Sequence, residues 1–454
     1  MGEQFTWSGG SQPDRLPRQV AAAMLGAIPS TDFHMRALNL AIALLLPASV
    51  AAQTRGFGTA PTPADEGFSA ARLARIDSLV MTTINEGRIP GAVVFISRHG
   101  RVVMHKAYGY RNLDTKEPLR RDDIFRIASQ SKAITALAVM MLWEEGKFGL
   151  DDPISRYIPE FKDAKVLKTF NATDSTWTGE SAKNRITIRH LLTHTSGLDY
   201  AAIGSDEFKA IYGKAGIPSG IGAKGSTIGE KMRILGTLPL KHEPGEKFTY
   251  ALGLDVLGYL VELTSGMPFD QFLRKRIFDP LGMKDTWFYL PADRASRLVT
   301  LHGGKDGKAV VWKDLIFDGI NPDYPKLPGT YFSGGAGLSS TTEDYARFLQ
   351  LFLNKGEFNG ARLLSPKTVE MMLTEQMPKL DLGEGLGFGL ETPGNDWQSP
   401  RSLGSFSWGG AFNTIYWADP KEGLIGQIYT NLYQNPAPEL GGKFVNLVYA
   451  AIVR

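Results

Sequence analysis

A serine and a lysine stand three positions apart in the stretch RIASQSKAIT, residues 126–135. At this spacing Ser129 and Lys132 lie on the same face of a helix. The residues that follow are strongly apolar up to Gly146, which predicts a helix that is buried nearly all round. A buried lysine needs partners or loses its proton, and a helix N-terminus presents free N–H groups to a developing oxyanion. Hydroxyl, amine and amide donors together are what acyl transfer by a serine nucleophile needs.

Taken alone, this pair has a simpler explanation, because serine often caps a helix and a first-turn lysine is often exposed. Two downstream segments favour catalysis. PGEKFTY ends at Tyr250, just before the apolar pattern LDVLGYLVEL, and FSWGGAFNTIYW contains the run Trp408-Gly409-Gly410 near a predicted C-terminal strand. Tyr250 could be a buried structural tyrosine and Trp408 could be ordinary strand packing, whereas the paired glycines indicate close approach of the backbone to a ligand.

These three segments, in this order, resemble the motifs of the serine β-lactamases and penicillin-recognising enzymes. FRIASQSKAIT is similar to their S-x-x-K motif, the segment around Tyr250 to the tyrosine motif of class C β-lactamases, and Trp408-Gly409-Gly410 to their K-T-G motif. LLTHTSGLDY (191–200) and GGAGLSSTTEDYARFLQLFL (334–353) are also typical of this superfamily. The resemblance extends from about residue 70 to the end of the chain.

Two departures from the class C pattern indicate a branch of this superfamily. Leu252 stands where those enzymes have asparagine, and Trp408 stands where K-T-G has its lysine. An indole offers an apolar face and one N–H donor in place of a cation, which disfavours anionic lactams and favours neutral acyl substrates. With Asp255 five residues after Tyr250, the sequence looks most like a family VIII carboxylesterase, for which some activity on β-lactams is expected from the shared fold.

The resemblance implies a role for each site residue. Ser129 attacks the ester carbonyl, and the positive charge of Lys132 favours the phenolate of Tyr250, so that the two residues act together as the base. The oxyanion lies between the backbone N–H groups of Ser129 and Ala411. The residues expected to bind the substrate are Trp408, Gly409 and Gly410, together with Ser129 and Ala411 of the oxyanion site. Asp255 is expected to orient its helix or to hydrogen-bond its neighbours.

The pattern of elements predicts an α/β fold in which an antiparallel β-sheet is flanked by helices, with an all-helical domain added, as in the serine β-lactamase-like fold. Ser69 precedes an amphipathic helix that ends at Gly87, and a hairpin follows with its turn at His99-Gly100. The C-terminus has a second hairpin turning at Asp419-Pro420 and a helix over 438–453. The predicted divisions are 53–160 and 330–454 for the α/β domain and 161–329 for the helical domain, with the glycine-rich segment 201–229 expected as a loop over the active site.

Composition excludes several other classes of chemistry. The chain has 454 residues, 50 basic against 47 acidic side chains and no cysteine, so thiol chemistry is excluded and nucleic acid is not an expected partner. No serine has glycine at both minus two and plus two, which argues against an α/β-hydrolase elbow. His190 and His194 have the spacing of a zinc pair but no adjacent glutamate, so we expect no metal and no cofactor.

The N-terminal region predicts export. MRALNLAIALLLPASVAAQ, from Met35, has a basic start, an apolar core and small residues at a cleavage site, and its apolar run is too short to span a membrane. We expect residues 1–52 to be an upstream extension and signal peptide, and the protein to be periplasmic or secreted without a stable membrane anchor. The expected partner is a small-molecule ester. The sequence leaves open the oligomeric state, a class C-like β-lactamase or D-amino-acid peptidase, and a penicillin sensor or scaffold that does not turn over.

Overall fold

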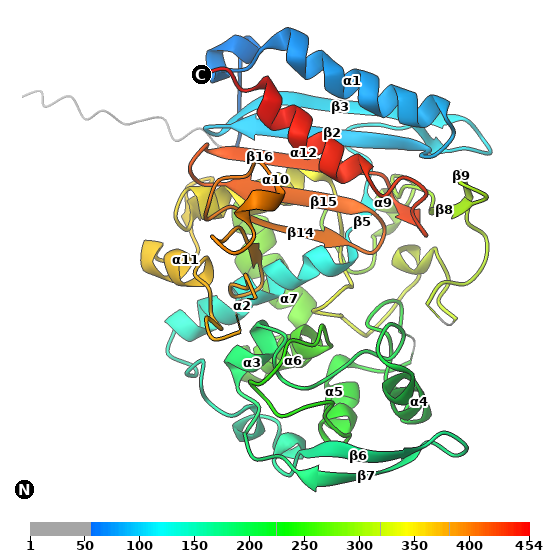
Figure 1. Cartoon of the computed structure of the whole chain (residues 1–454), viewed down its shortest axis with the longest axis vertical. Coiled ribbons are helices and arrows are strands. Elements are labelled where there is room, and N and C mark those ends of the chain that lie inside the picture. The colour runs from blue at the N-terminus through cyan, green and yellow to red at the C-terminus, as the bar shows by residue number, and fades with distance from the viewer. Residues whose placement is uncertain (1–55, 224, 318, 381) are drawn as a thin grey trace, which may run out of the picture. The chain divides into compact units, whose positions relative to one another are not determined.

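Strands from both ends of the described chain form one large sheet (Figure 1). The structure is a computed structural model, and it describes residues 56–454 apart from 224, 318 and 381. The sheet has eight strands in the order β1-β3-β2-β16-β15-β14-β13, with β4 paired to β3. Their bounds are Gly58–Thr59 (β1), Gly91–Arg98 (β2), Arg101–Asn112 (β3), Glu117–Pro118 (β4), Gly389–Leu390 (β13), Phe406–Gly410 (β14), Thr414–Asp419 (β15) and Leu424–Tyr429 (β16).

The N-terminal and C-terminal hairpins meet at the centre of this sheet. β2 pairs antiparallel with β16, from the Leu424–Arg98 pair to the Tyr429–Val93 pair. The residues of both strands are buried throughout, because helices cover both faces of the sheet. The predicted turn at His99-Gly100 is confirmed, with φ of 50° and 74°, and so is the predicted antiparallel sheet built from the two ends of the fold.

The two helices predicted near the ends of the fold lie together on one face of the sheet, as Figure 1 shows for the blue and red helices. α1 spans Ala70–Asn85, and the Ser69 side chain caps it by accepting the N–H of Arg72. α12 spans Leu440–Ala451. Apolar side chains of the two helices, Ile76, Val80 and Phe444, pack in one cluster with Val94, Ile96 and Trp417 of the sheet.

The opposite face packs against the apolar helix that follows Ser129. α2 spans Ser131–Glu144, and every residue from 131 to 142 is buried. It contacts α6, Gly253–Ser265, whose first nine residues are also buried. α10, Thr342–Leu353, covers the same face of the sheet. The prediction of a helix buried nearly all round is therefore confirmed, and it ends just before Gly146, which has φ 71°.

The segment predicted as all-helical contains strands as well, so that part of the prediction is wrong. β6 (Lys165–Asn171) pairs with β7 (Thr176–Ser181), and β8 (His302–Lys305) pairs with β9 (Lys308–Val311). β6 and β7 are only partly buried, and a register shift between Leu167 and Thr169 interrupts the alternation of apolar and polar residues that marks a half-buried strand. β8 and β9 turn at Asp306-Gly307, with φ of 49° and 74°, a two-residue hairpin signal that the glycine-rich flanks obscured.

The remaining elements are short apart from the helices of the middle segment. The helices are α3 (Ile188–Leu192), α4 (Asp206–Lys214), α5 (Ile228–Gly236), α7 (Phe269–Leu273), α8 (Asp279–Leu281), α9 (Ala292–Ala295) and α11 (Pro366–Met372). The strands are β5 (Phe125–Arg126), β10 (Ser339–Ser340), β11 (Glu357–Phe358), β12 (Ala361–Arg362) and β17 (Leu432–Tyr433). None of the helices within 56–454 is long and apolar enough to cross a membrane. The predicted upstream extension and signal peptide, 1–52, lies outside the described residues.

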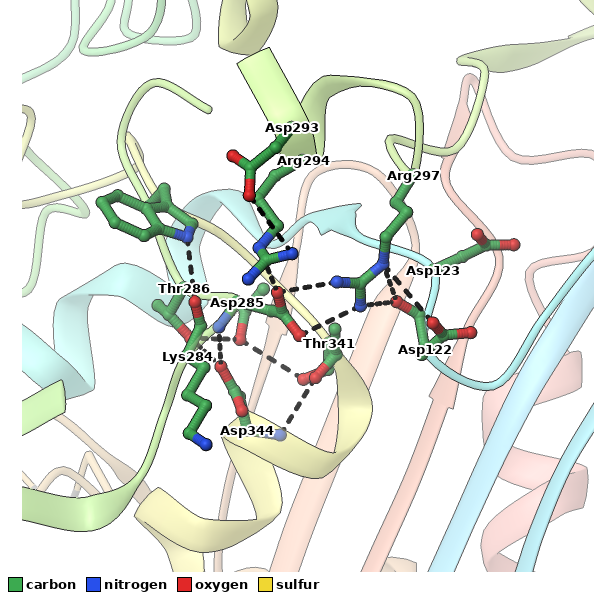
Figure 2. Close-up of polar contacts among 12 residues, drawn as sticks. Asp122, Asp123, Lys284, Asp285, Thr286, Asp293, Arg294, Arg297, Thr341 and Asp344 are labelled. Carbon is green, nitrogen blue, oxygen red and sulfur yellow. Dashed lines mark hydrogen bonds and ion pairs between the residues drawn. The ribbon is translucent and has the colours of Figure 1, made fainter. Parts of the chain in front are cut away.

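A network of hydrogen bonds and ion pairs around Asp285, Arg297 and Asp344 lies next to the strand that leads to Ser129 (Figure 2). Arg297 donates to both carboxylate oxygens of Asp285, at 2.7 and 3.0 Å, and also to the carbonyl of Asp122. The carboxylate of Asp344, at the start of α10, accepts the N–H of Asp285 at 2.7 Å and the hydroxyl of Thr286 at 3.0 Å. Since β10 pairs with β5 one residue before α10 begins, the network holds α10 and the β5–β10 pair together.

Asp344 should make stability depend on pH. Burial raises the pKa of its carboxyl to about 6 from an ordinary value of 3.8. Between these two values the folded state binds more protons than the unfolded state, so the free energy of unfolding from this group falls as pH rises through that window and stays low above it. Asp344→Asn keeps an oxygen acceptor without the charge. It is expected to stabilise the protein at pH 7 by on the order of 2 kcal/mol, with no gain at pH 4.

Urea unfolding at both pH values measures this difference. Other groups also titrate in the window, but they are common to the two proteins, so the comparison isolates Asp344. An equal difference between variant and wild type at pH 4 and pH 7 would contradict the assignment.

Candidate active site

Ser129 sits on a strained turn between β5 and α2. It belongs to a short 3₁₀ turn, Ala128–Gln130, and is partly exposed, whereas Ala128 and Gln130 are buried. Ala128 has φ 42°, a left-handed conformation that costs a non-glycine residue on the order of 1 kcal/mol. The neighbouring Ser131 points into the protein, where its hydroxyl accepts the N–H of Leu338 at 3.0 Å. Of the two serines in the motif, only Ser129 is therefore presented as a nucleophile.

The ammonium group of Lys132 is buried and held by three oxygens. Its Nζ donates to the carbonyl of Gly335 at 2.8 Å, to the hydroxyl of Tyr200 at 2.9 Å and to Oγ of Ser129 at 3.5 Å. The side chain is 2% exposed, so these contacts replace water around the group. Two short bonds fix the amine in place and the third, longer one directs it to the serine. The predicted Ser129–Lys132 contact within one helical turn is present.

Tyr250 lies on the other side of the same ammonium group. Nζ of Lys132 is 4.4 Å from the centre of its ring, which is within the range of a cation–π contact. The ring stacks on Trp408, with centroids 6.0 Å apart and planes at 25°. The hydroxyl oxygen of Tyr250 is buried and has no hydrogen-bond partner among the described residues. Ser129, Lys132 and Tyr250 thus converge from three distant parts of the sequence.

Two glycines let the segment 333–338 pass between α2 and α6. A Cβ on Gly334 would lie 2.2 Å from the carbonyl oxygen of Leu254, and a Cβ on Gly335 would lie 2.6 Å from a carboxylate oxygen of Asp255. Asp255 is fully buried in the first turn of α6 and accepts the hydroxyl of Tyr331 at 3.3 Å. Burial raises the pKa of Asp255 to about 6, and a hydrogen bond from Ser333 and the charge of Lys132 oppose that shift.

Tyr200 is a second tyrosine at the site, and it differs from Tyr250. Burial, reinforced by Tyr250 and Asp255, raises the pKa of Tyr200 well above 10. Tyr200 therefore remains a neutral hydroxyl at neutral pH and serves as an acceptor for Lys132. Sequence reasoning missed Tyr200 and Gly335 as partners of the lysine, although they stand in the two supporting stretches, 191–200 and 334–353.

The end of β14 forms the opposite wall. A Cβ on Gly410 would lie 2.4 Å from the carbonyl oxygen of Ile127, so β14 approaches the turn that carries Ser129 as closely as a backbone can. Among the described residues, neither the N–H of Ser129 nor that of Ala411 has an acceptor. Both donors are free to bind a substrate oxygen, as the predicted oxyanion site requires.

Gly410→Ala should therefore damage the oxyanion site. The added methyl group would also lie 2.4 Å from Oγ1 of Thr414, so the end of β14 must move and carry the N–H of Ala411 with it. We expect kcat to fall about 100-fold to 1,000-fold, the usual cost of losing one such donor. Gly409→Ala is the comparison, since its Cβ would be 3.5 Å from its nearest neighbour, and its effect should be far smaller. Equal losses in ester-hydrolysis assays would contradict this account.

The two histidines that share the spacing of a zinc pair have separate environments. His190 lies in α3 and its Nδ1 accepts the N–H of Thr187 at 3.3 Å, whereas His194 lies beyond the end of α3 and packs against Tyr250. No group of three or more acidic or histidine side chains suited to a metal ion occurs in the part of the chain that the structure describes. The site residues that are present suit acyl transfer without a metal.

The predicted loop 201–229 contains the short helix α4, as expected. Its second half lies beside the nucleophile turn, where Ile221 packs in one apolar cluster with Ala128 and Phe412. A Cβ on Gly220 would lie 3.7 Å from a carboxylate oxygen of Asp255. This segment therefore borders the site from the side of Ala128.

Comparison with known proteins agrees with this geometry. The family model described as Beta-lactamase matches residues 74–450. The chain belongs to this family. It is 34% identical over 355 residues to Protein Rv1367c of Mycobacterium tuberculosis, which covers 75% of this chain and 85% of that protein. It is 29% identical over 412 residues to Esterase EstB of Burkholderia gladioli, covering 84% of this chain and 96% of the relative.

A solved structure gives the same result for the fold. That of "EstCE1, a hydrolase with promiscuous acyltransferase activity" superposes with a TM-score of 0.73 at 28% identity, covering 83% of this chain and 98% of that chain. The predicted serine β-lactamase-like fold and the resemblance to family VIII carboxylesterases are both confirmed.

Proposed function

We propose that this member of the Beta-lactamase family is a serine carboxylesterase that hydrolyses short-to-medium acyl esters through an acyl-enzyme on Ser129. The observation that carries the proposal is the position of the Lys132 ammonium, 3.5 Å from the Ser129 hydroxyl and 4.4 Å from the centre of the Tyr250 ring. A cation between a hydroxyl and a phenol can stabilise negative charge that develops on either oxygen during the reaction. The similarity to an esterase, Esterase EstB, supports the same reaction class.

The chemistry runs in two halves. Oγ of Ser129 attacks the ester carbonyl while the phenolate of Tyr250 takes its proton, and the carbonyl oxygen becomes an oxyanion held by the N–H groups of Ser129 and Ala411. When the tetrahedral intermediate collapses, the leaving alkoxide takes that proton from Tyr250. Water then attacks the acyl-enzyme, gives a proton to the phenolate, and the acid leaves as Ser129 regains its hydrogen.

The wall formed by Trp408 favours neutral substrates. Its indole stacks on Tyr250 at 25° and lies 6.3 Å from the ring of His194, so the site is bordered by aromatic rings. An ester with an uncharged acyl group gains from this surface, whereas the carboxylate of a penicillin would need a cation there. We propose turnover of β-lactams only as a side activity.

We also propose that the protein is exported, and that its partner is a small-molecule ester.

A substrate panel tests the proposal. Purified protein is given p-nitrophenyl butyrate, nitrocefin and D-alanine p-nitroanilide, with kcat/KM measured for each. The ester is expected to have the highest value and to be turned over many times. A higher value for nitrocefin would favour a class C-like β-lactamase, and one for the anilide a D-amino-acid peptidase. Release of no more than one nitrophenol per protein would favour a sensor, and no release a scaffold.

A further inference from the structure

A single residue, His194, accepts the N–H groups of both residues that flank Tyr250. Its carbonyl oxygen accepts the N–H of Thr249 at 2.8 Å, and Nδ1 of its ring accepts the N–H of Ala251 at 3.3 Å. The ring also packs on the phenol, with centroids 4.7 Å apart and planes at 46°. The backbone on each side of Tyr250 and one face of its ring are therefore held from the same point.

The ring of His194 is held in one protonation state. It is 3% exposed, and burial, reinforced by the positive charge of Lys132, lowers the pKa of His194 well below 6.5. The imidazole is therefore neutral at neutral pH. Since a backbone N–H can only donate, Nδ1 must carry the lone pair, and the proton resides on Nε2. A neutral ring also adds no second cation beside Lys132.

The backbone of His194 has a left-handed conformation just after the end of α3. Its φ is 55°, a conformation that is uncommon for residues other than glycine but enriched in asparagine, aspartate and histidine. The turn carries the chain away from the end of α3, where the N–H of Thr195 binds the carbonyl of His190 at 2.9 Å. That conformation presents the carbonyl and the ring of His194 to the same strand-like segment, 249–251. Strain of this kind persists where the surroundings fix it, and it gathers at functional sites.

We infer that His194 is a positioning residue, which holds the Tyr250 hydroxyl in reach of Ser129 and Lys132. The inference rests on the proposed function, because it assigns His194 a part in the reaction through Tyr250. The hydroxyl of Tyr250 has no hydrogen-bond partner among the described residues. Its position therefore depends on the contacts that hold the ring and the backbone of Tyr250. His194 does not touch the substrate carbonyl in this scheme.

Another histidine provides a matched control. His242 is 8% exposed and hydrogen-bonds to the same segment, but through the side chain of Thr249, with Nε2 and Oγ1 2.9 Å apart. It holds neither peptide group beside Tyr250. Loss of His242 should therefore weaken the fold locally without displacing the phenol.

The experiment compares His194→Ala, His194→Asn and His242→Ala in ester hydrolysis, with thermal unfolding measured for each. His194→Ala loses the ring and the Nδ1 acceptor, and a misplacement of the base by about 1 Å should lower kcat about 100-fold with KM changed less than about threefold. Asparagine accepts the left-handed backbone and its side-chain oxygen can replace Nδ1, so His194→Asn is expected to recover at least about tenfold of the loss. His242→Ala should keep kcat within about threefold of wild type, even if its melting temperature falls as far as that of His194→Ala.

Three results would overturn the inference: an unchanged kcat in His194→Ala, an equal loss in His242→Ala, or no recovery in His194→Asn. A crystal structure of a His194 variant gives a test that does not depend on turnover, since residues 249–251 are expected to shift relative to Lys132, and an unmoved Tyr250 would also overturn it. If the wild type hydrolyses no ester, the proposed function fails by itself, and the crystal structure still decides whether His194 holds Tyr250.

Discussion

Ser129→Ala is expected to abolish multiple turnover of esters and to lower kcat by about four orders of magnitude or more, while the protein remains folded. In the proposed mechanism this hydroxyl forms the acyl-enzyme, so what survives is the weak effect of binding an ester near the N–H groups of residues 129 and 411. Rates with p-nitrophenyl butyrate measure the loss. Intact-mass spectrometry of wild type quenched early in the reaction should detect an acyl adduct that the variant lacks.

Ser131→Ala is the matched control for that variant. The two serines are neighbours, but the hydroxyl of Ser131 accepts the N–H of Leu338 inside the protein. Its loss leaves a buried donor unsatisfied and should cost roughly 1 to 3 kcal/mol of stability, with kcat nearly unchanged. If Ser131→Ala lost turnover as completely as Ser129→Ala, or if the acyl adduct formed without Ser129, the nucleophile would be assigned wrongly.

The arrangement around Lys132 explains how one amine can serve a two-step reaction. The carbonyl of Gly335 and the hydroxyl of Tyr200 occupy two of its three N–H donors. The amine therefore cannot rotate away from Ser129 and Tyr250 as the proton moves between them. Both tyrosines contact the lysine, but burial raises the pKa of Tyr200 well above 10 and its hydroxyl accepts a hydrogen bond from Lys132, whereas Tyr250 is the phenol that we propose as the base.

Most of the fold could be predicted from the sequence, because its signals are local. The cap at Ser69, the turn at His99-Gly100 and the unbroken apolar run after Ser129 each depend on a few neighbouring residues. The hairpin β6–β7 was missed because its local sequence signal is weak. Its apolar side chains, which include Phe170 and Trp177, are only partly buried against the core, and a register shift in β6 interrupts their alternation, so periodicity carries little signal.

The motifs were enough to predict that Ser129, Lys132 and Tyr250 lie together, but not to predict the residues around them. Tyr200, Gly335 and His194 stand in stretches that are typical of the superfamily, but each acquires its contacts only when these stretches pack against α2 and the segment around Tyr250. That packing requires the glycines at 334 and 335, because a side chain at either position would collide with α6. A sequence shows the glycines but not what they approach.

Tyr250→Phe is expected to lower kcat by about three orders of magnitude without destabilising the protein. Phenylalanine keeps the ring that packs on His194 and stacks on Trp408, and it removes only the hydroxyl that we propose as the base. That hydroxyl is buried with no partner within the described residues, and such a group costs roughly 1 to 3 kcal/mol. The variant should therefore melt at the same temperature as wild type or higher, a loss of function that accompanies a gain in stability.

Tyr416→Phe separates the two effects. The hydroxyl of Tyr416 is likewise buried without a partner in the described part of the chain, but Tyr416 lies within β15 and takes no part in the proposed reaction. It should reproduce the gain in melting temperature while kcat stays within about threefold of wild type. Together the two variants test whether the orphan hydroxyl at the site is kept for chemistry. If Tyr250→Phe kept its turnover, or lost stability that Tyr416→Phe did not, the phenol would be a structural group and the base would have to be Lys132 alone.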